Sequence, residues 1–516
     1  MTTKPLPRVA LVPKDEGAIK IDDLRGRRTA ELVIAFVGPV GSGCSKSAAI
    51  VKKLLESQYK YDTVAYHRVS SLIEENATLA GEKYDASVGG AERVDRLQEI
   101  GNKLRKKFGS DYLVAKVVER IAAHRLEKGG YEKTEKDVLV TQPKRWAHII
   151  DSIKNPAELA LLRDVYGDML WVFGVFAPEE TRENRLRSLE GWDARRLTEL
   201  LDRDTKQELV YGQGVRDTFF QADFFVRNDG QNDDPLIRTL ARHLEVIFGV
   251  PVRTPNDEEA AMYAAYAAAS MSACMSRQVG AAILSEQREV IGLGWNDVPK
   301  FGGGLYGAED GDEDHRCFKW GPRVCHNDDR KDRLYKDIYD ELQGLLRPEV
   351  TEDQARAALR KTDVRQLIEY SRSVHAEMAA LISVARGSKP GLIGATLYCT
   401  TFPCHSCARH LVAAGIRRVV YIEPYPKSLT LDLHSDATSI RSIDKNKMLL
   451  EQYEGASPRN LLRLFKPHEL VRKAEGRLID FSPTGAHPVT SVSVDDFSTH
   501  EKRVLAKLKE IETPES

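Results

Sequence analysis

The sequence predicts an α/β protein with two consecutive domains, each built on a β-sheet with helices on its faces. Over residues 29–250, apolar runs typical of buried strands alternate with helical stretches, and the first run leads straight into a glycine-rich turn. Over 251–480, a second alternation of strands and helices carries a His, a Glu and two Cys in a compact pattern. We expect an N-terminal arm at 1–28 and a linker with a tail helix at 481–516.

The composition is that of a globular protein without a strong charge bias. Of 516 residues, 42% are hydrophobic and 30% are charged, and the formal net charge is -1. This balance argues against overall electrostatic attraction to nucleic acid or to an anionic membrane, although it leaves room for a local basic groove. No apolar run approaches the ~20 residues that span a bilayer, and seven cysteines do not suggest a disulfide scaffold. We therefore expect a cytoplasmic protein without membrane contact.

The first domain opens with the layout of a phosphate-binding loop. Glu31 to Val37 is a nearly continuous apolar run, as in a buried parallel strand, and a helix follows the glycine-rich turn after it. In such a turn, backbone N–H groups and the helix dipole face an anion. The residues expected to bind a nucleotide or phosphate are Gly38, Gly41, Gly43, Ser45, Lys46 and Ser47.

This loop departs from the usual pattern at its lysine. With Gly38 and Gly43 in register, Cys44 stands where the phosphate-binding Lys belongs, and Lys46 comes two positions late. With Lys46 in register, Ser45 replaces the second glycine. Either the loop is remodelled around Lys46, or it binds phosphate without the usual lysine. A plain glycine turn of an α/β fold is the alternative.

The remainder of the first domain continues the alternation and predicts a parallel three-layer sheet. Asp151 ends one strand, where a magnesium-orienting carboxylate usually lies. The Arg-rich stretch 182–216 resembles the lid of nucleoside-monophosphate kinases, and a solvated pair of charged helices is its alternative. The predicted helices are 91–126 and 235–248, and the predicted strands are 138–140, 146–150, 170–176 and 224–228.

The second domain carries the pattern with the strongest chemical meaning. His375 and Glu377 form an H-A-E triplet, and Cys404 and Cys407 form P-C-H-S-C. One His and two Cys supply three zinc ligands, which leaves the fourth position open, as in catalytic zinc sites. A redox pair or half of a structural zinc site explains C-x-x-C alone, but not the combination, which is typical of zinc-dependent base deaminases. Glu377 is then the proton carrier.

The sequence context places both halves of this pattern at helix N-termini. Residues 374–384 read as a helix with His375 in its first turn, and 394–400 read as a strand that leads to the Cys pair. A helix then runs to Gly415, and another apolar strand follows. Thiolates are favoured at helix N-termini by the helix dipole.

The first part of this domain, before the catalytic helix, includes a long insertion at 300–371. A helix is expected at 257–275, and strands are expected at 279–284 and 290–295. Four potential ligands cluster within the insertion and could hold a second, structural zinc: His315, Cys317, Cys325 and His326.

The second domain resembles the deoxycytidylate deaminase family. The resemblance covers roughly 257–425 and includes S-R-Q-V-G-A, G-W-N-D-V-P, H-A-E and P-C-H-S-C-A. It implies a five-stranded sheet with zinc between two helices, and a homo-oligomer. It also implies that Asn296 fixes the sugar and the pyrimidine. Arg277 and Lys427 are candidates for the nucleotide phosphate, with exposed salt bridges as the alternative.

The combination of a P-loop-kinase-like domain with such a domain resembles the bacterial antiviral cytidine deaminases. That resemblance implies deamination of dCMP and dCTP during phage infection, which distorts the deoxynucleotide pool. The P-loop domain would gate the deaminase, with Mg²⁺ and a nucleotide as its ligands. A regulatory RNA or a phage-derived effector would provide the signal.

The predicted reaction is hydrolytic deamination at C4 of a free deoxycytidine nucleotide, with Glu377 moving protons. One alternative is a deaminase of cytosine or adenine in RNA or single-stranded DNA, which needs a basic track or stacking aromatics. Another is a nucleotide-sensing, kinase-like regulator. The near-neutral charge and the intact zinc pattern beside an altered P-loop favour the free-nucleotide deaminase.

Overall fold

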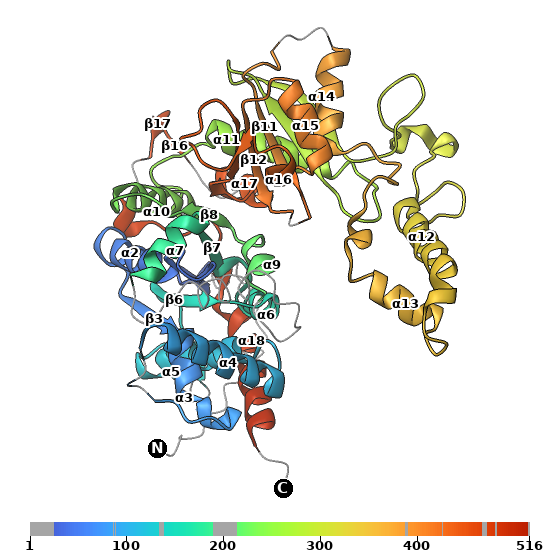
Figure 1. The fold of residues 1–516 in the computed structure, drawn as a ribbon. Coiled ribbons are helices and arrows are strands. Elements are labelled where there is room, and N and C mark those ends of the chain that lie inside the picture. Colours follow the sequence, from blue (N-terminus) through green and yellow to red (C-terminus); the bar gives the residue numbers. More distant parts are fainter. Residues whose placement is uncertain are drawn as a thin grey trace. The chain divides into compact units, whose positions relative to one another are not determined.

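The computed structural model describes residues 25–85, 87, 89–133, 139–188, 214–387, 391–425, 427–466, 472–479 and 482–513 (Figure 1). Almost all of the expected arm at 1–28, and 189–213 of the Arg-rich stretch, lie outside them. The chain divides into two compact units. The first joins Met1–Thr254 to Glu454–Ser516, and the second is Pro255–Tyr453.

The first unit contains a six-stranded sheet with five parallel strands, in the order β15-β8-β7-β2-β6-β3. From β3, the parallel strands are second, third, first, fourth and fifth in chain order. Edge strand β15 pairs antiparallel with β8. The strands of this sheet are β2 (Leu32–Val37), β3 (Thr63–Arg68), β6 (Trp146–Ile153), β7 (Leu170–Phe176), β8 (Phe224–Arg227) and β15 (Gly455–Ala456).

Helices cover both faces of this sheet, which confirms the predicted three layers (Figure 1). Leu32, Ile34 and Phe36 of β2 share a core with α2 and α10, whereas α5 packs against β6 on the other face. The helices of the first unit are α2 (Cys44–Ser57), α3 (Val69–Glu75), α4 (Gly90–Phe108), α5 (Tyr112–Glu127), α6 (Pro156–Tyr166), α7 (Glu179–Arg187), α9 (Val215–Phe219), α10 (Asp234–Phe248), α17 (Leu461–Phe465) and α18 (Val494–Glu512).

Short elements complete the unit. They are the strand pairs β1 (Arg28–Thr29) with β18 (Val492–Ser493), β4 (Tyr131–Lys133) with β5 (Leu139–Thr141), and β16 (Lys473–Ala474) with β17 (Arg477–Leu478), and the 3₁₀ helices η1 (Ala77–Ala80), η2 (Gly167–Met169), η6 (Pro458–Asn460) and η7 (Pro483–Gly485).

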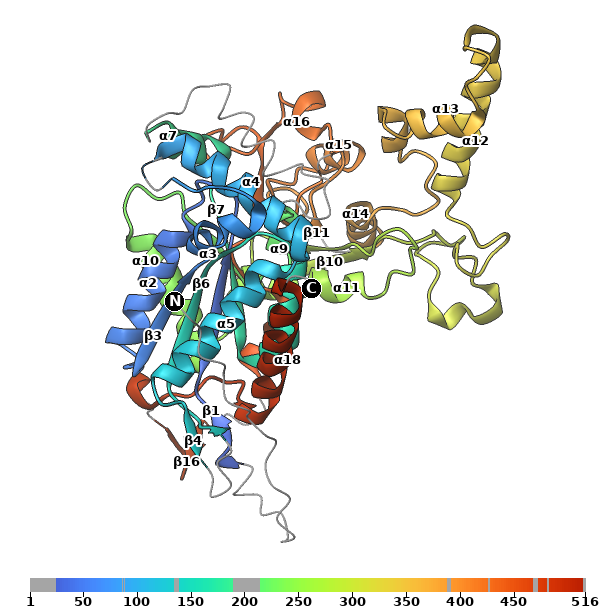
Figure 2. The ribbon, with the colours of Figure 1, turned by 90° about the horizontal axis from the view of Figure 1, so that it is seen from below.

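The C-terminal segment differs from the sequence expectation. The second domain was expected to reach 480 and to be followed by a linker, but Glu454–Ser516 packs with the first unit. Helix α18 begins at Val494, within the expected linker, and lies beside α5 (Figure 2). Its Glu501 pairs with Arg125 of α5, so this helix is part of the first unit's core.

The second unit is built on a six-stranded sheet in the order β10-β9-β11-β12-β14-β13. The implied five strands are present, and β13, of two residues, is the addition. Strands β10 and β11 pair antiparallel with β9, and the others pair in parallel. The strands are β9 (Gly280–Leu284), β10 (Val290–Trp295), β11 (Thr396–Thr401), β12 (Arg418–Glu423), β13 (Thr438–Ser439) and β14 (Met448–Gln452).

Helix α11 packs on this sheet, and α14 and α15 pack against one another at its core. Helix α11 ends at Ala269 rather than at 275. Of the described residues, no helix is both long enough and apolar enough to cross a membrane. The helices are α11 (Asp257–Ala269), α12 (His326–Leu342), α13 (Glu352–Leu359), α14 (Ala376–Arg386), α15 (His405–Ala413) and α16 (Thr430–Leu433), with η3 (Ala308–Glu313), η4 (Gln343–Leu345) and η5 (Asp363–Gln366) in the insertion.

Candidate metal centre and phosphate loop

Two helix N-termini of the second unit carry the predicted metal ligands. His375 is the N-cap of α14, and Cys404 is the N-cap of α15, with Cys407 in the first turn of α15. Helix α14 approaches β10 closely because Gly294 has no side chain. A Cβ built there would lie 2.2 Å from the backbone N of Ala380. This close packing sets the position of His375.

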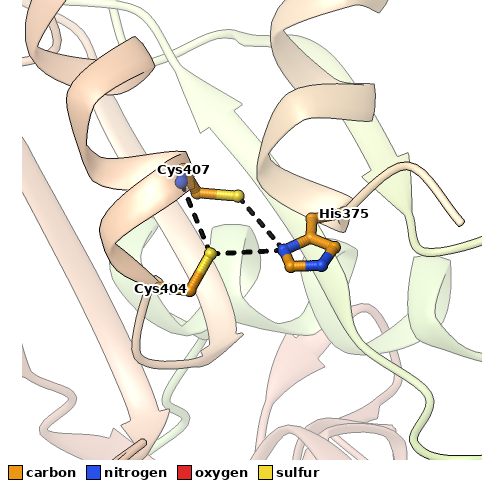
Figure 3. Close-up of side chains that lie close together, drawn as sticks. All are labelled: His375, Cys404 and Cys407. Atoms are coloured by element: carbon orange, nitrogen blue, oxygen red, sulfur yellow. Dashed lines mark hydrogen bonds between the residues drawn. The ribbon is translucent and has the colours of Figure 1, made fainter. Parts of the chain in front are cut away.

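The three side chains converge (Figure 3). Nδ1 of His375 lies 3.4 Å from Sγ of Cys404 and 3.4 Å from Sγ of Cys407. All three ligand atoms lie within 4.8 Å of one another, and both cysteines are buried. Zinc–ligand bonds of 2.0–2.3 Å in a tetrahedron separate N and S atoms by about 3.6 Å. The donor set and its spacing therefore fit zinc.

The three ligands share protons strongly, and the hydrogen bond with Cys404 raises the pKa of Cys407. The Cys407 thiol and His375 lower the pKa of Cys404 to about 4, and the hydrogen bond with Cys404 raises the pKa of His375 to about 9. Thiolate is the form of Cys that binds metals. Glu377 lies in the first turn of α14 and is buried, which raises its pKa to about 7. A carboxyl with this pKa can accept and return a proton near neutral pH.

Asn296 lies at the end of β10 and braces a neighbouring loop. Its Oδ1 accepts a hydrogen bond from the backbone N of Val279 at 2.7 Å, and its Nδ2 donates to the backbone O of Arg277 at 2.8 Å. The next residue, Asp297, accepts from the backbone N of Val374, directly before His375. The G-W-N-D turn is thus joined to the start of the metal-binding helix.

The predicted phosphate contacts lie near one another. Arg277 pairs with Glu423 at 3.5 Å, and both side chains are about half exposed. Partial burial lowers the pKa of Lys427, and the cations Arg365, Lys331 and Arg277 lower it further. Ser428 donates to the carbonyl of Pro403 at 2.7 Å, which ties this loop to the turn before Cys404.

Arg277, Lys331, Arg365 and Lys427 form a basic cluster, and two of its members could not be predicted from the sequence. Lys331 of α12 and Arg365 of η5 belong to the insertion, and Nζ of Lys331 donates to the backbone O of Arg365 at 3.4 Å. No local motif marks them, because their proximity to Lys427 depends on how the insertion folds back.

The four potential ligands in the insertion do not form a metal-binding group in the part of the chain that is described, where His375, Cys404 and Cys407 form the one such group. His315 contacts Tyr306, with Nδ1 to OH at 3.2 Å, and the ring of Trp320 lies near the rings of both His315 and His326. Cys317 lies near Cys325 and near Cys274, a cysteine outside the predicted set. The second zinc stays a prediction.

The predicted phosphate loop of the first unit joins β2 to α2, as expected. Gly41 and Gly43 have φ of 82° and 94°, in the left-handed region that suits glycine. The Ser45 hydroxyl donates to Oδ2 of Asp151 at 2.7 Å. Lys46 instead forms an exposed ion pair with Asp233 of the loop before α10.

Comparison with known proteins agrees with this geometry. The family model "Cytidine and deoxycytidylate deaminase zinc-binding region" matches residues 255–423. The deoxycytidylate deaminase of Enterobacteria phage T4 is 31% identical over 170 residues, which are 32% of this chain and 76% of the phage protein. That of Mycobacterium phage D29 is 31% identical over 167 residues, which are 32% of this chain and 94% of the phage protein.

A UPF0200 protein of Saccharolobus islandicus is 23% identical over 203 residues, which are 39% of this chain and 87% of that protein. The first unit has the five parallel strands and the glycine-rich loop of a P-loop-kinase-like fold, and the second has the zinc ligands of the deaminases. With a P-loop-kinase-like unit fused to its deaminase domain, the chain belongs to the deoxycytidylate deaminase family.

Proposed function

We propose that this protein deaminates free deoxycytidine nucleotides, dCMP, dCTP or both, to dUMP or dUTP with release of ammonia. The proposal rests on the convergence of His375, Cys404 and Cys407 into one potential zinc site. The buried Glu377 lies two positions after His375 in the sequence. The similarity to deoxycytidylate deaminases of phages supports the choice of substrate.

The residues of the site divide the chemistry among them. His375, Cys404 and Cys407 would hold zinc, which supplies a Lewis acid that activates water near neutral pH. Glu377 accepts a proton from the water and delivers it to N3 of the ring as the water oxygen bonds to C4. Glu377 then transfers the second proton to the amino group, the C4–N bond breaks, and ammonia leaves. Water is consumed and ammonia is released, so the atoms balance.

The nucleotide is proposed to bind by its sugar and phosphates to groups beside the metal centre. Asn296 uses one donor and one acceptor within the protein, and its amide has one more of each for a sugar hydroxyl. Arg277 and Lys427 would contact the first phosphate. The insertion's Lys331 and Arg365 add positive charge that a triphosphate can use, which supports dCTP as a substrate.

The biological role we propose is antiphage defence through distortion of the deoxynucleotide pool, with the P-loop-kinase-like unit gating the deaminase. Its support is the fusion of the two units in one chain. In this proposal the P-loop-kinase-like unit keeps the deaminase inactive until an RNA or a phage-derived effector binds. The enzyme would act as a homo-oligomer. The test is the dCTP pool of phage-infected cells that express the protein or its Glu377→Ala variant. Depletion that requires Glu377 supports the role, and equal pools contradict it.

The reaction is tested with purified protein, dCMP, dCTP, CMP and a cytosine-containing single strand, by measurement of ammonia and uracil products. We expect turnover of dCMP or dCTP and none by Glu377→Gln, which keeps the size of the side chain. Glu289→Gln, at an exposed position, is the matched control and should retain full activity. Turnover of the single strand alone would contradict the proposal and favour a polynucleotide deaminase.

A further inference from the structure

The phosphate loop of the first unit lacks its usual lysine, yet its backbone keeps the shape of an anion cradle. A Cβ on Gly43 would lie 2.1 Å from Nδ2 of Asn228, and one on Gly38 would lie 2.2 Å from the backbone O of Val175. Nδ2 of the buried Asn228 donates to the backbone O of Ser42 at 2.7 Å. The surrounding structure therefore leaves no room for a side chain at Gly38 or Gly43, as is typical of loops whose backbone N–H groups bind an anion.

The residue in the lysine position cannot contribute positive charge. Cys44 is buried, and its Sγ lies 3.6 Å from Oγ of Ser42. Lys46, the other candidate, is about half exposed and is paired with Asp233. A phosphate in the loop must be neutralised by cations from elsewhere in the unit.

Two cations from neighbouring elements contact the loop directly. Lys154 follows β6, and its Nζ donates to the carbonyl of Gly38, the first glycine of the loop, at 2.6 Å. Arg185 of α7 donates through Nη1 to the carbonyl of Gly41 at 3.1 Å and through Nη2 to the carbonyl of Asn228 at 2.8 Å. No carboxylate among the described residues forms an ion pair with either. Both side chains keep N–H donors that a ligand can use.

A third set of groups suits a divalent cation that accompanies phosphate. The Ser45 hydroxyl and the Tyr66 hydroxyl each donate to Oδ2 of Asp151 at 2.7 Å. A hydroxyl beside a carboxylate offers the oxygen ligands that Mg²⁺ prefers. In the first turn of α2, the Ser47 hydroxyl is fully buried and has no hydrogen-bond partner in the described part of the chain.

We propose that the first unit binds a nucleoside polyphosphate with Mg²⁺, and that Lys154 and Arg185 replace the missing lysine of the phosphate loop. Lys46 has no part in this site. This inference rests on the proposed gating role of the first unit and names its ligand, but its test measures nucleotide binding rather than deamination. A failure of deamination would therefore leave it intact.

The test is isothermal titration of the full-length protein with MgATP and with MgGTP. Lys154→Met removes the ammonium and keeps the length of the side chain. We expect it to weaken binding by about ten- to hundred-fold, as loss of a charge-assisted hydrogen bond does. Lys154→Arg should retain most of the affinity. Zinc content and thermal unfolding of each variant show whether it is folded.

Two variants on α2 provide the controls. Lys46→Ala and Lys52→Ala each remove one positive charge near the loop, and neither should change the affinity by more than about twofold. A Cys44→Lys change added to Lys154→Met should restore binding, because it returns the ammonium to the usual position. The proposal is overturned if the wild-type protein binds neither nucleotide, or if Lys46→Ala abolishes binding while Lys154→Met does not.

Discussion

At the scale of single residues, the metal centre is the part of the molecule that the sequence predicts best. Its ligands lie in two short motifs, and each motif starts a helix, so local sequence determines the local geometry. Asn296 could be named from its turn, but its bracing of the 277–279 loop could not, because those hydrogen bonds cross between strands. No sequence motif marks Lys154 or Arg185. Their contacts with the phosphate loop arise because the end of β6 and helix α7 pack beside that loop in the folded unit.

Replacement of one thiol should remove one zinc ion from each chain. We expect Cys404→Ala to lose one equivalent of zinc relative to the wild-type protein. The two remaining protein ligands bind zinc too weakly to retain it during dialysis. The second unit should also lose stability, since metal binding and folding are linked. Plasma emission spectrometry of dialysed protein is the measurement. Cys399→Ala is the matched control, because Cys399 is a buried cysteine of β11 outside the cluster. Equal zinc content in both variants would contradict the assignment.

The basic cluster of the insertion should distinguish triphosphate from monophosphate. We expect Lys331→Ala to raise KM for dCTP by about tenfold and to leave KM for dCMP within about twofold, because in the proposed site this side chain contacts the phosphates beyond the first. Lys427→Ala should raise KM for both substrates. Steady-state kinetics with the two nucleotides is the measurement, and Lys336→Ala, on the exposed part of α12, is the control. An equal effect of Lys331→Ala on both substrates would assign that side chain a different role.

At the scale of elements, strands made entirely of apolar residues could be predicted from the sequence, whereas a strand that mixes apolar and polar residues could not. All residues of β2 and β7 are buried and apolar, so their runs stand out in the sequence. Strand β3 is an edge strand with polar ends, and only its Val64 and His67 are buried, so no apolar run or alternation predicts it. The predicted helix at 91–126 is two helices, because Gly109 adopts φ of 116° and ends α4. A single glycine in a long helical pattern is a weak signal of such a break.

The contact between α14 and β10 should be essential for the metal centre. In Gly294→Ala the new Cβ would lie 2.3 Å from the carbonyl of Ala376, so α14 must shift and carry His375 and Glu377 with it. We expect a loss of about 1–3 kcal/mol in the free energy of unfolding of the second unit, and lower zinc affinity. Calorimetry and competition with a zinc chelator are the measurements. Gly344→Ala is the control, because no atom lies within 4 Å of a Cβ there. Wild-type zinc affinity in Gly294→Ala would show that the helix is not held by this contact.

At the scale of the whole molecule, the first unit is formed by both ends of the chain. The amphipathic pattern near the C-terminus predicted a helix, but not the surface that it covers, because that surface is more than 350 residues away in the sequence. Arg125 of α5 is fully buried between Glu31 and Glu501, and its guanidinium lies 4.8 Å from the ring centroid of Phe497. Burial raises the pKa of Glu31, but Arg125 and His148 lower it more, to about 2. Glu31 therefore adds stability above its ordinary pKa of 4.5 that is lost as pH falls toward 2.

The ion pairs of Arg125 join α18 to the first unit. Removal of the Arg125 charge should therefore lower the free energy of unfolding of that unit. In Arg125→Met, Glu501 loses its ion pair and Glu31 keeps only the contact with His148. Removal of one partner of a buried pair costs about 3–5 kcal/mol. Glu501→Gln should cost less, because Gln keeps the size of the side chain and Arg125 keeps its ion pair with Glu31. The measurement is calorimetry, with zinc content as a separate report on the second unit. Lys507→Ala, at an exposed position of the same helix, should stay within about 0.5 kcal/mol of the wild-type protein. If Arg125→Met unfolded at the wild-type temperature, α18 would not contribute to the stability of the first unit.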